Sequence, residues 1–354
     1  MKTVRVVLLI LCGILAAVSP CFSQVSPDGN YIVADFNVSE TDYHPYASLG
    51  LVAFSEGGNG THQELFTSGT DPLETSPFTY SASPDGSLTV NSETAMHGIL
   101  SANGAAFALS TTEGGYPGIG VALKKSSGMT NATMTGSYIV ADFSASESSH
   151  QSYADLGLVS VNGTGGGTHQ MLYTSSGSPS TSSFTYSVSA DGSLTVNSET
   201  AMHGILSADG SLFVLSTTAG SNPGITVGVR KSSGMSNANM KGDYIIAVLT
   251  SSKTSYEPFS DLDLVKVNGS GSGTFSALHN SSPGGAGSGT FTYSVQPDGS
   301  LTINGETVEH GIISADGSVF VLSNTEGAYA GITVGIKKAF STRAMPWLLL
   351  LLDD

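Results

Sequence analysis

The sequence has little cysteine and few basic residues, and each shortage excludes a class of function. The only cysteines, Cys12 and Cys21, fall within residues 1–23. If that segment is a leader that is removed, the mature chain has no disulfide, no thiol nucleophile and no cysteine metal site. Lys and Arg number 12 against 28 Asp and Glu, and losing Lys2 and Arg5 with the leader takes the net charge from −16 to −18. Without a basic surface, neither nucleic acid nor an anionic membrane is an expected partner.

Long apolar runs are also missing. The run at residues 6–18 follows Lys2 and Arg5 and is too short to span a bilayer comfortably, so it indicates a secretory signal peptide. Cleavage after Ser23 is expected, which makes 1–23 the signal peptide and the protein secreted or part of the cell envelope. A lipoprotein anchored through Cys21 is the alternative. The apolar run in the tail at 341–354 is shorter still, so no membrane span is expected in the mature chain.

Motifs of common catalytic sites are absent from the sequence. There is no Gly-x-Ser-x-Gly elbow, no His-Glu-x-x-His helix and no phosphate-binding loop. We therefore expect a protein that is not an enzyme and that needs no cofactor and no metal.

What the sequence does contain is a repeat. The stretch DGSLTVNSETAMHGILSA occurs at 85–102 and again, unchanged, at 191–208, and a third copy at 298–315 reads DGSLTINGETVEHGIISA. Aligning the flanking residues divides the mature chain into three repeats of about 106 residues at 24–130, 131–236 and 237–340, followed by a tail at 341–354.

Each repeat has the pattern of eight short strands. Apolar and polar residues alternate, as in Phe184, Tyr186 and Val188 against Thr185 and Ser187. Asp-Gly pairs at 85–86, 191–192 and 298–299 separate the fourth strand from the fifth, and this pair favours the positive φ of a tight hairpin. The sequence therefore predicts an all-β protein built from antiparallel meanders.

Two architectures fit this meander. In the first, each repeat closes as a small eight-stranded barrel, which removes its sheet edges; an excised second repeat should then fold by itself. In the second, the chain is one six-bladed β-propeller with two blades per repeat. The propeller is supported by strands such as SLFVLS and YIVADF, which are apolar on both faces.

The barrel version resembles a known family. Each repeat opens with Gly-x-Tyr and ends with a basic residue in its last strand, which is similar to the calycin pattern of lipocalins and avidins. The resemblance implies that the opening aromatic packs against the last-strand basic residue and that the barrel mouth holds a small apolar ligand. The implied closure pairs are Tyr31 with Lys124, Tyr138 with Arg230, and Tyr244 with Lys337.

A glutamate and a histidine four residues apart recur in all three repeats. These candidate ligand-binding residues are Glu93 and His97, Glu199 and His203, and Glu306 and His310. In the alternative interpretation, the histidine closes a loop by hydrogen bonds and the glutamate is solvated. Two further histidines, His62 and His169, have Phe275 as their counterpart in the third repeat, which argues against a catalytic role shared by all three.

The sequence thus predicts an exported, non-enzymatic repeat protein with a structural or adhesive role at the cell surface. The alternative is a protein that binds a small apolar ligand or a glycan. Its partner is unknown from the sequence: a small ligand, a glycan and another surface protein all remain open. A lined cavity inside a repeat would favour binding, and a filled core would favour the structural role.

Overall fold

The computed structural model describes residues 26–339 except 71, 92–94, 198–200, 256, 282–286 and 306–307. Each repeat forms a closed antiparallel barrel of eight strands in chain order. Barrel 1 consists of β1 (Gly29–Val38), β2 (Pro45–Ser55), β3 (Asn59–Thr67), β4 (Thr75–Ala82), β5 (Ser87–Asn91), β6 (Ala95–Leu100), β7 (Ala106–Thr111) and β8 (Gly118–Lys124). The prediction of three tandem barrels is confirmed, and the propeller alternative is wrong.

Barrels 2 and 3 repeat this order, each preceded by one turn of 3₁₀-helix. Barrel 2 follows η1 (Asn131–Thr133) and consists of β9 (Thr135–Ala145), β10 (Ser152–Asn162), β11 (Gly166–Thr174), β12 (Thr181–Val188), β13 (Ser193–Asn197), β14 (Ala201–Leu206), β15 (Leu212–Thr217) and β16 (Gly224–Arg230). Barrel 3 follows η2 (Asn237–Asn239) and consists of β17 (Lys241–Ser252), β18 (Pro258–Asn268), β19 (Ser272–Asn280), β20 (Ser288–Val295), β21 (Ser300–Asn304), β22 (Val308–Ile313), β23 (Val319–Asn324) and β24 (Tyr329–Lys337). Nowhere in the described residues is there a helix of the length and apolarity needed to cross a bilayer.

The Asp-Gly hairpins form as the sequence predicts. Gly86 has a φ of +89°, and the Asp85 carboxylate accepts a hydrogen bond of 3.0 Å from the Ser87 amide. Gly192 and Gly299 adopt the same backbone conformation in the other two barrels. A side chain at this left-handed position would be strained, which explains why glycine follows aspartate in every copy.

The first and last strands of each repeat are neighbours, which closes the barrel. β1 pairs with both β2 and β8, and the register sets Tyr31 opposite Lys124. Arg230 lies opposite Tyr138 and Lys337 lies opposite Tyr244 in the same way. This closed eight-stranded meander fits the calycin-like fold that the sequence resembles.

The tyrosine of each Gly-x-Tyr is part of the core inside its barrel. Tyr31, Tyr138 and Tyr244 are all fully buried. Their hydroxyls donate to the carbonyls of Gly104, Gly210 and Gly317, at 2.6, 2.5 and 2.6 Å. Each of these glycines lies in the turn between the sixth and seventh strands, so the tyrosine ties the first strand to the far side of the barrel.

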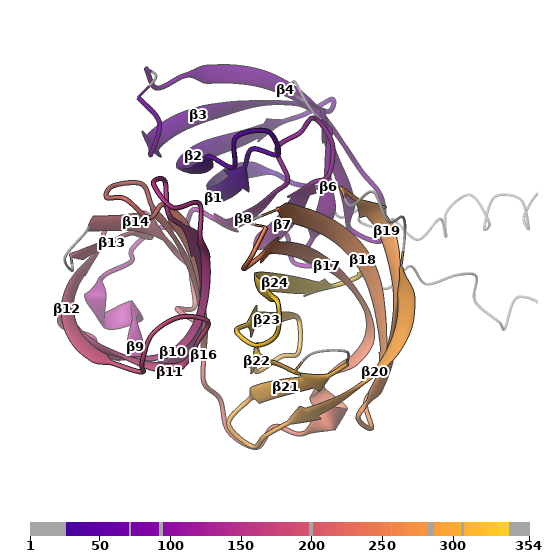
Figure 1. The fold of residues 1–354 in the computed structure, drawn as a ribbon. Helices are drawn as coiled ribbons and strands as arrows, with labels where there is room; N and C mark the ends of the chain where they lie inside the picture. The colour runs from indigo at the N-terminus through magenta and orange to yellow at the C-terminus, as the bar shows by residue number, and fades with distance from the viewer. Residues whose placement is uncertain are drawn as a thin grey trace, which may run out of the picture.

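The strands that are apolar on both faces pack barrel against barrel. Figure 1 shows the three barrels around a common centre, with β7, β8, β17, β23 and β24 near the middle. Their outward-facing residues merge into one apolar cluster that draws on all three barrels, in which Phe36 of barrel 1 meets Phe143 of barrel 2 at 5.5 Å between ring centroids. The apolar outer faces of these strands, which favoured a propeller, therefore form the core between the barrels.

The three inter-barrel contacts are equivalent and form a closed ring. β1 and β2 of barrel 1 pack on β15, β9 and β10 of barrel 2 pack on β23, and β17 and β18 of barrel 3 pack on β7. Each barrel thus presents one face to the next and a different face to the one before. Such head-to-tail contacts close when the rotation between units fits a whole turn, here after three barrels.

Candidate functional site

Barrel 1 contains a cavity of about 780 Å³ with an apolar floor. The floor is made of residues whose side chains point into the barrel: Val33, Val52, Phe54, Phe78, Phe107 and Leu109. The mouth lies at the opposite end, where Asn37, Tyr46 and the exposed Tyr116 line it. A cavity of this size matches the range of small-molecule sites in proteins.

Polar groups line the wall between floor and mouth. Asp35 follows Tyr31 and Val33 on the inward face of β1, and His62 and Glu64 come from β3. Glu64 is held at two points, because its Oε1 accepts from the Tyr46 hydroxyl at 2.7 Å and its Oε2 from the Glu74 amide at 3.3 Å. The site therefore has two carboxylates above an apolar floor, and that of Glu64 is held in place by hydrogen bonds.

His62 fits inside the barrel because its neighbour on β2 is a glycine. A Cβ on Gly50 would lie 2.0 Å from His62 Nε2, so no other residue leaves room for the ring in this position. Nε2 is buried and makes no hydrogen bond within the described part of the chain. Such an unpaired group is costly unless a ligand or water completes it.

Burial controls the charge of the site. Burial raises the pKa of Asp35 to about 6, while His62 lowers it and Glu64 raises it. Burial likewise raises the pKa of Tyr46 to about 12. At neutral pH Asp35 is therefore mostly ionised, and a cation placed beside it would offset the cost of keeping that charge away from water.

Barrel 2 keeps part of this arrangement. Asp142 and His169 stand at the positions of Asp35 and His62, and Gly157 again makes room for the ring, with a built Cβ 2.1 Å from His169 Nε2. Asp142 accepts a short hydrogen bond from Thr226. Asp155 stands in place of Ser48, and burial raises its pKa to about 6.

Barrel 3 has lost the same three residues together. Val248, Phe275 and Asp263 replace the aspartate, the histidine and the glycine. Burial, helped by Asp261, raises the pKa of Asp263 to about 7, and burial raises that of Glu309, which replaces Met96 and Met202, to about 7. The barrels thus share a framework but differ in the polar groups that face inward.

The histidines of the recurrent Glu–His pairs lie on the outside of the barrels. Each Nδ1 is close to a threonine Oγ1 on the preceding strand: His97 to Thr89 at 3.3 Å, His203 to Thr195 at 3.4 Å and His310 to Thr302 at 3.5 Å. Burial lowers the pKa of all three. Glu93, Glu199 and Glu306 lie outside the described residues, so ligand binding by these pairs stays a prediction.

Each of these histidines stacks on a ring of the neighbouring barrel. His97 lies 3.8 Å from His279 of barrel 3, His203 lies 3.9 Å from Phe66 of barrel 1, and His310 lies 4.1 Å from Tyr173 of barrel 2, measured between ring centroids. The ring planes are within 6° of parallel in every case. The structure therefore assigns these side chains to the contacts between barrels.

The closure pairs differ in what the basic group does. Lys337 Nζ lies 5.8 Å from the centre of the Tyr244 ring. Arg230 donates to the Asp209 carbonyl at 3.1 Å, beside the turn that Tyr138 contacts. Lys124 instead forms an ion pair of 2.6 Å with Asp28. The register places all three pairs together, but only one has its cation over the ring.

The described residues contain no group of three or more His, Cys, Asp or Glu that could hold a metal ion. Asp35, His62 and Glu64 do not form such a group, and the buried Nε2 of His62 has no hydrogen-bond partner in this part of the chain. The arrangement is suited to holding a polar group of a ligand by charge and hydrogen bonds.

Comparisons with known proteins give no family for this chain. No family model matches it, and no curated protein matches it significantly. Among solved structures it is similar to a protein of unknown function from the DUF3598 family of Nostoc punctiforme, with 10% identity, a TM-score of 0.23, and coverage of 59% of this chain and 97% of that one.

Two further solved structures show similarity at the same low level. One is the isotype 1 transferrin binding protein B from serogroup B Neisseria meningitidis, with 9% identity, a TM-score of 0.28, and coverage of 88% of this chain and 77% of that one. The other is the Helicobacter pylori β clamp in complex with 5-chloroisatin, with 10% identity, a TM-score of 0.12, and coverage of 91% and 94%. At these scores the likeness carries no information on function.

Proposed function

We propose that this is an exported, non-enzymatic binding protein whose first barrel holds a small molecule with an apolar body and a protonated amine. The observation that carries the proposal is the cavity of about 780 Å³ in barrel 1, with aromatic residues at its floor and carboxylates on its wall. A lined cavity favours the binding alternative over a purely structural or adhesive role.

The charge of the wall favours a cation over an anion. His62 is the only basic residue among those that line the cavity, whereas Asp35 and Glu64 are both acidic. A carboxylate ligand would therefore be repelled, and an amine would be attracted. A hydrogen bond to a charged group contributes roughly 1.5–3 kcal/mol, and burying an apolar body against Phe54 and Phe107 adds about 25 cal/mol per Å².

The inward differences between barrels support binding rather than scaffolding. The strands at 85–102 and 191–208 are identical in sequence, yet Glu64 of barrel 1 is replaced by Met171 in barrel 2 and by Ala277 in barrel 3. A framework that stays constant while its cavity residues change is what ligand specificity requires.

Calorimetric titration tests this function. The probes are 2-phenylethylamine and tryptamine, with phenylacetate and indole-3-acetate as matched carboxylates. We expect the amines to bind with one strong site and the carboxylates not to bind. Asp35→Asn with Glu64→Gln should weaken amine binding at least tenfold, equivalent to about 1.4 kcal/mol.

The matched control is Asp243→Asn, which removes an exposed carboxylate on barrel 3. It should leave amine affinity unchanged. Equal binding of amines and carboxylates, or an affinity that does not respond to the changes at Asp35 and Glu64, would refute the proposed site. Export is tested separately: N-terminal sequencing of secreted protein should begin at Gln24.

A further inference from the structure

One of the three contacts in the ring joins barrels that are not consecutive in the chain. Residues 125–134 connect barrel 1 to barrel 2, and residues 231–240 connect barrel 2 to barrel 3. Barrel 3 is connected to barrel 1 only through barrel 2, yet its β17 and β18 pack on β7 of barrel 1. We call this meeting surface the unlinked contact, and the other two the linked contacts.

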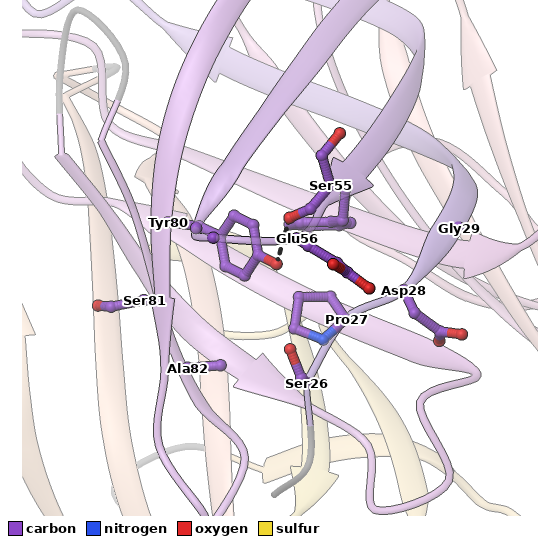
Figure 2. Close-up of a pocket in the computed structure, with 12 residues that line it drawn as sticks. Ser26, Pro27, Asp28, Gly29, Ser55, Glu56, Tyr80, Ser81 and Ala82 are labelled. Carbon is purple, nitrogen blue, oxygen red and sulfur yellow. Dashed lines mark hydrogen bonds between the residues drawn. The ribbon is translucent and has the colours of Figure 1, made fainter.

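The linkers are built into the barrels that they enter. Met134 belongs to the core of barrel 2, and Met240 belongs to that of barrel 3. In barrel 1 the equivalent residue is Pro27, which is buried and precedes β1 of the same barrel (Figure 2). At this position barrel 1 is therefore completed by its own residue, whereas barrels 2 and 3 are each held by a linker.

The face that barrel 3 turns towards barrel 1 is more polar than the equivalent faces of barrels 1 and 2. At two positions it has serine in place of an apolar residue: Ser251 for Val38 and Ala145, and Ser260 for Ala47 and Ala154. The Ser251 hydroxyl is buried and has no hydrogen-bond partner within the described part of the chain. Such a group makes a contact less stable.

The neighbouring strand β19 shows the same difference. Leu65 and Leu172 pack against the apolar cluster shared by the barrels, whereas their counterpart Leu278 is 47% exposed. The next residue is His279, where barrel 1 has phenylalanine and barrel 2 has tyrosine. The barrel 3 side of the unlinked contact therefore buries less apolar surface than the matching sides of the linked contacts.

The barrel 1 side of the unlinked contact has smaller side chains. Two outward positions of the seventh strand are Ala106 and Ala108 in β7, Leu212 and Val214 in β15, and Val319 and Val321 in β23. Hydrophobic stabilisation grows with the apolar area that is removed from water. The unlinked contact is therefore the weakest of the three on both of its sides.

The strand at this contact is also a wall of the cavity in barrel 1. Phe107 and Leu109 of β7 line the cavity, while Ala108 between them faces outwards. Thr111, at the end of β7, lines the cavity as well, and its carbonyl accepts a hydrogen bond from Ser260 of barrel 3. Barrel 3 thus supports this wall from outside.

We infer that the ring opens and recloses at the unlinked contact while the two linked contacts stay closed. In the open state β17 and β18 move away from β7, all three barrels stay folded, and the outer side of the cavity wall meets solvent. Local opening of this kind occurs where the fewest apolar contacts must be broken. The inference concerns the framework and does not depend on the ligand proposed for the cavity.

Thiol labelling tests this in the full chain carrying Cys12→Ser and Cys21→Ser, which leaves no other cysteine. The repeats supply matched reporters, each buried in a different contact: Ala108→Cys in the unlinked contact, and Val214→Cys and Val321→Cys in the linked ones. With N-ethylmaleimide as the probe, we expect Ala108→Cys to react at least tenfold faster than either of the others. A tenfold difference corresponds to about 1.4 kcal/mol in the free energy of opening.

A second variant tests the physical reason. Ser251→Val introduces the residue of barrel 1 and removes the unpaired hydroxyl, so it should slow the labelling of Ala108→Cys by about tenfold. Thr292→Val is the matched control, because this threonine is exposed on another strand of barrel 3. It should leave the labelling rate unchanged.

A third reporter separates opening of the contact from unfolding of a barrel. Val265 is buried inside barrel 3, so Val265→Cys should react much more slowly than Ala108→Cys. Equal rates for the three contact reporters would overturn the inference, as would a rate for Ala108→Cys that Ser251→Val does not slow. Labelling of Val265→Cys as fast as that of Ala108→Cys would also overturn it, because barrel 3 would then unfold instead of moving away.

Discussion

Lys338 of the third repeat forms an ion pair of 2.8 Å with Asp85 of the first. Nothing in the chain order requires these residues to meet, whereas Lys125 and Asp191 are brought together by a linker between consecutive barrels. Because the unlinked contact copies the linked ones, the three barrels form a closed ring and not an open string.

Breaking this pair should have a small, salt-dependent effect. The side chains are 23% and 28% exposed, so Lys338→Met is expected to lower the free energy of unfolding by about 0.5–1 kcal/mol at low salt. Chemical denaturation at low and high salt measures this. Lys125→Met, which breaks the equivalent ion pair at a covalent linker, is the matched comparison. A loss of unfolding free energy in Lys338→Met that persists unchanged in high salt would contradict an electrostatic role.

An excised second repeat should fold but not stay monomeric. Its barrel is closed by its own strands, yet the outward faces of β9 and β15 bury Ile139 and Val214 against the other barrels. A fragment of residues 129–236 carries both faces of the head-to-tail contact, so we expect three copies to assemble into a ring. Light scattering coupled to size exclusion gives the mass.

The control for this prediction is Val214→Lys in the same fragment, which should abolish the trimer by placing a charge in the contact. A fragment that is soluble and monomeric without this change would show that the shared core is not required.

The sequence predicted the barrels but not their arrangement, for a physical reason. Alternation within strands such as 184–188 and the Asp-Gly turns are local signals, so strand number and hairpins could be read directly. The apolar outer faces of β7, β15 and β23 indicate only that these faces are covered, not which element covers them. Blade packing and barrel packing leave the same pattern, and only the spatial arrangement distinguishes them.

The contact between barrels 3 and 1 should be more acid-sensitive than the other two, because it alone stacks two imidazoles. Burial and the neighbouring His279 lower the pKa of His97. A lowered pKa in the folded state means that the contribution to stability is full above the unfolded value near 6.5 and is lost as pH falls below it. His279→Tyr, which introduces the residue found at Tyr173 of barrel 2, removes one of the two imidazoles.

We expect His279→Tyr to move the midpoint of acid unfolding to lower pH, with a gain of at most about 1 kcal/mol because His97 is partly exposed. Circular dichroism across pH 4–8 follows the transition. Phe66→Tyr, at the stack with His203, is the control and should leave the midpoint in place. A shift of equal size in both variants would rule out repulsion between His97 and His279.

Gly157 should be intolerant of a side chain for as long as His169 remains. A Cβ would lie 2.1 Å from His169 Nε2, so Gly157→Ala is expected to cost about 1–3 kcal/mol of unfolding free energy. Adding His169→Ala should recover most of that loss, giving a strong coupling in a double-mutant cycle measured by denaturant unfolding. Additive losses would mean that the ring does not lie over the glycine.

The candidate site was missed in the sequence although part of its signal was present. Phe275 in the third repeat argues against a role shared by His62 and His169, but the aspartate and the glycine change in the same repeat, to Val248 and Asp263. That joint change indicates three residues in contact. The recurrent Glu–His pairs drew attention instead, because identity between repeats does not tell an inward position from a contact between barrels.

The most direct test of the proposed function is a crystal structure of the protein soaked with 2-phenylethylamine. We expect the ligand inside barrel 1, with its ring on the floor formed by Phe54 and Phe107 and its nitrogen within hydrogen-bond distance of Asp35 or Glu64. A cavity that stays free of ligand in a soak well above the calorimetric Kd, or a ligand bound with its nitrogen towards the floor, would contradict it.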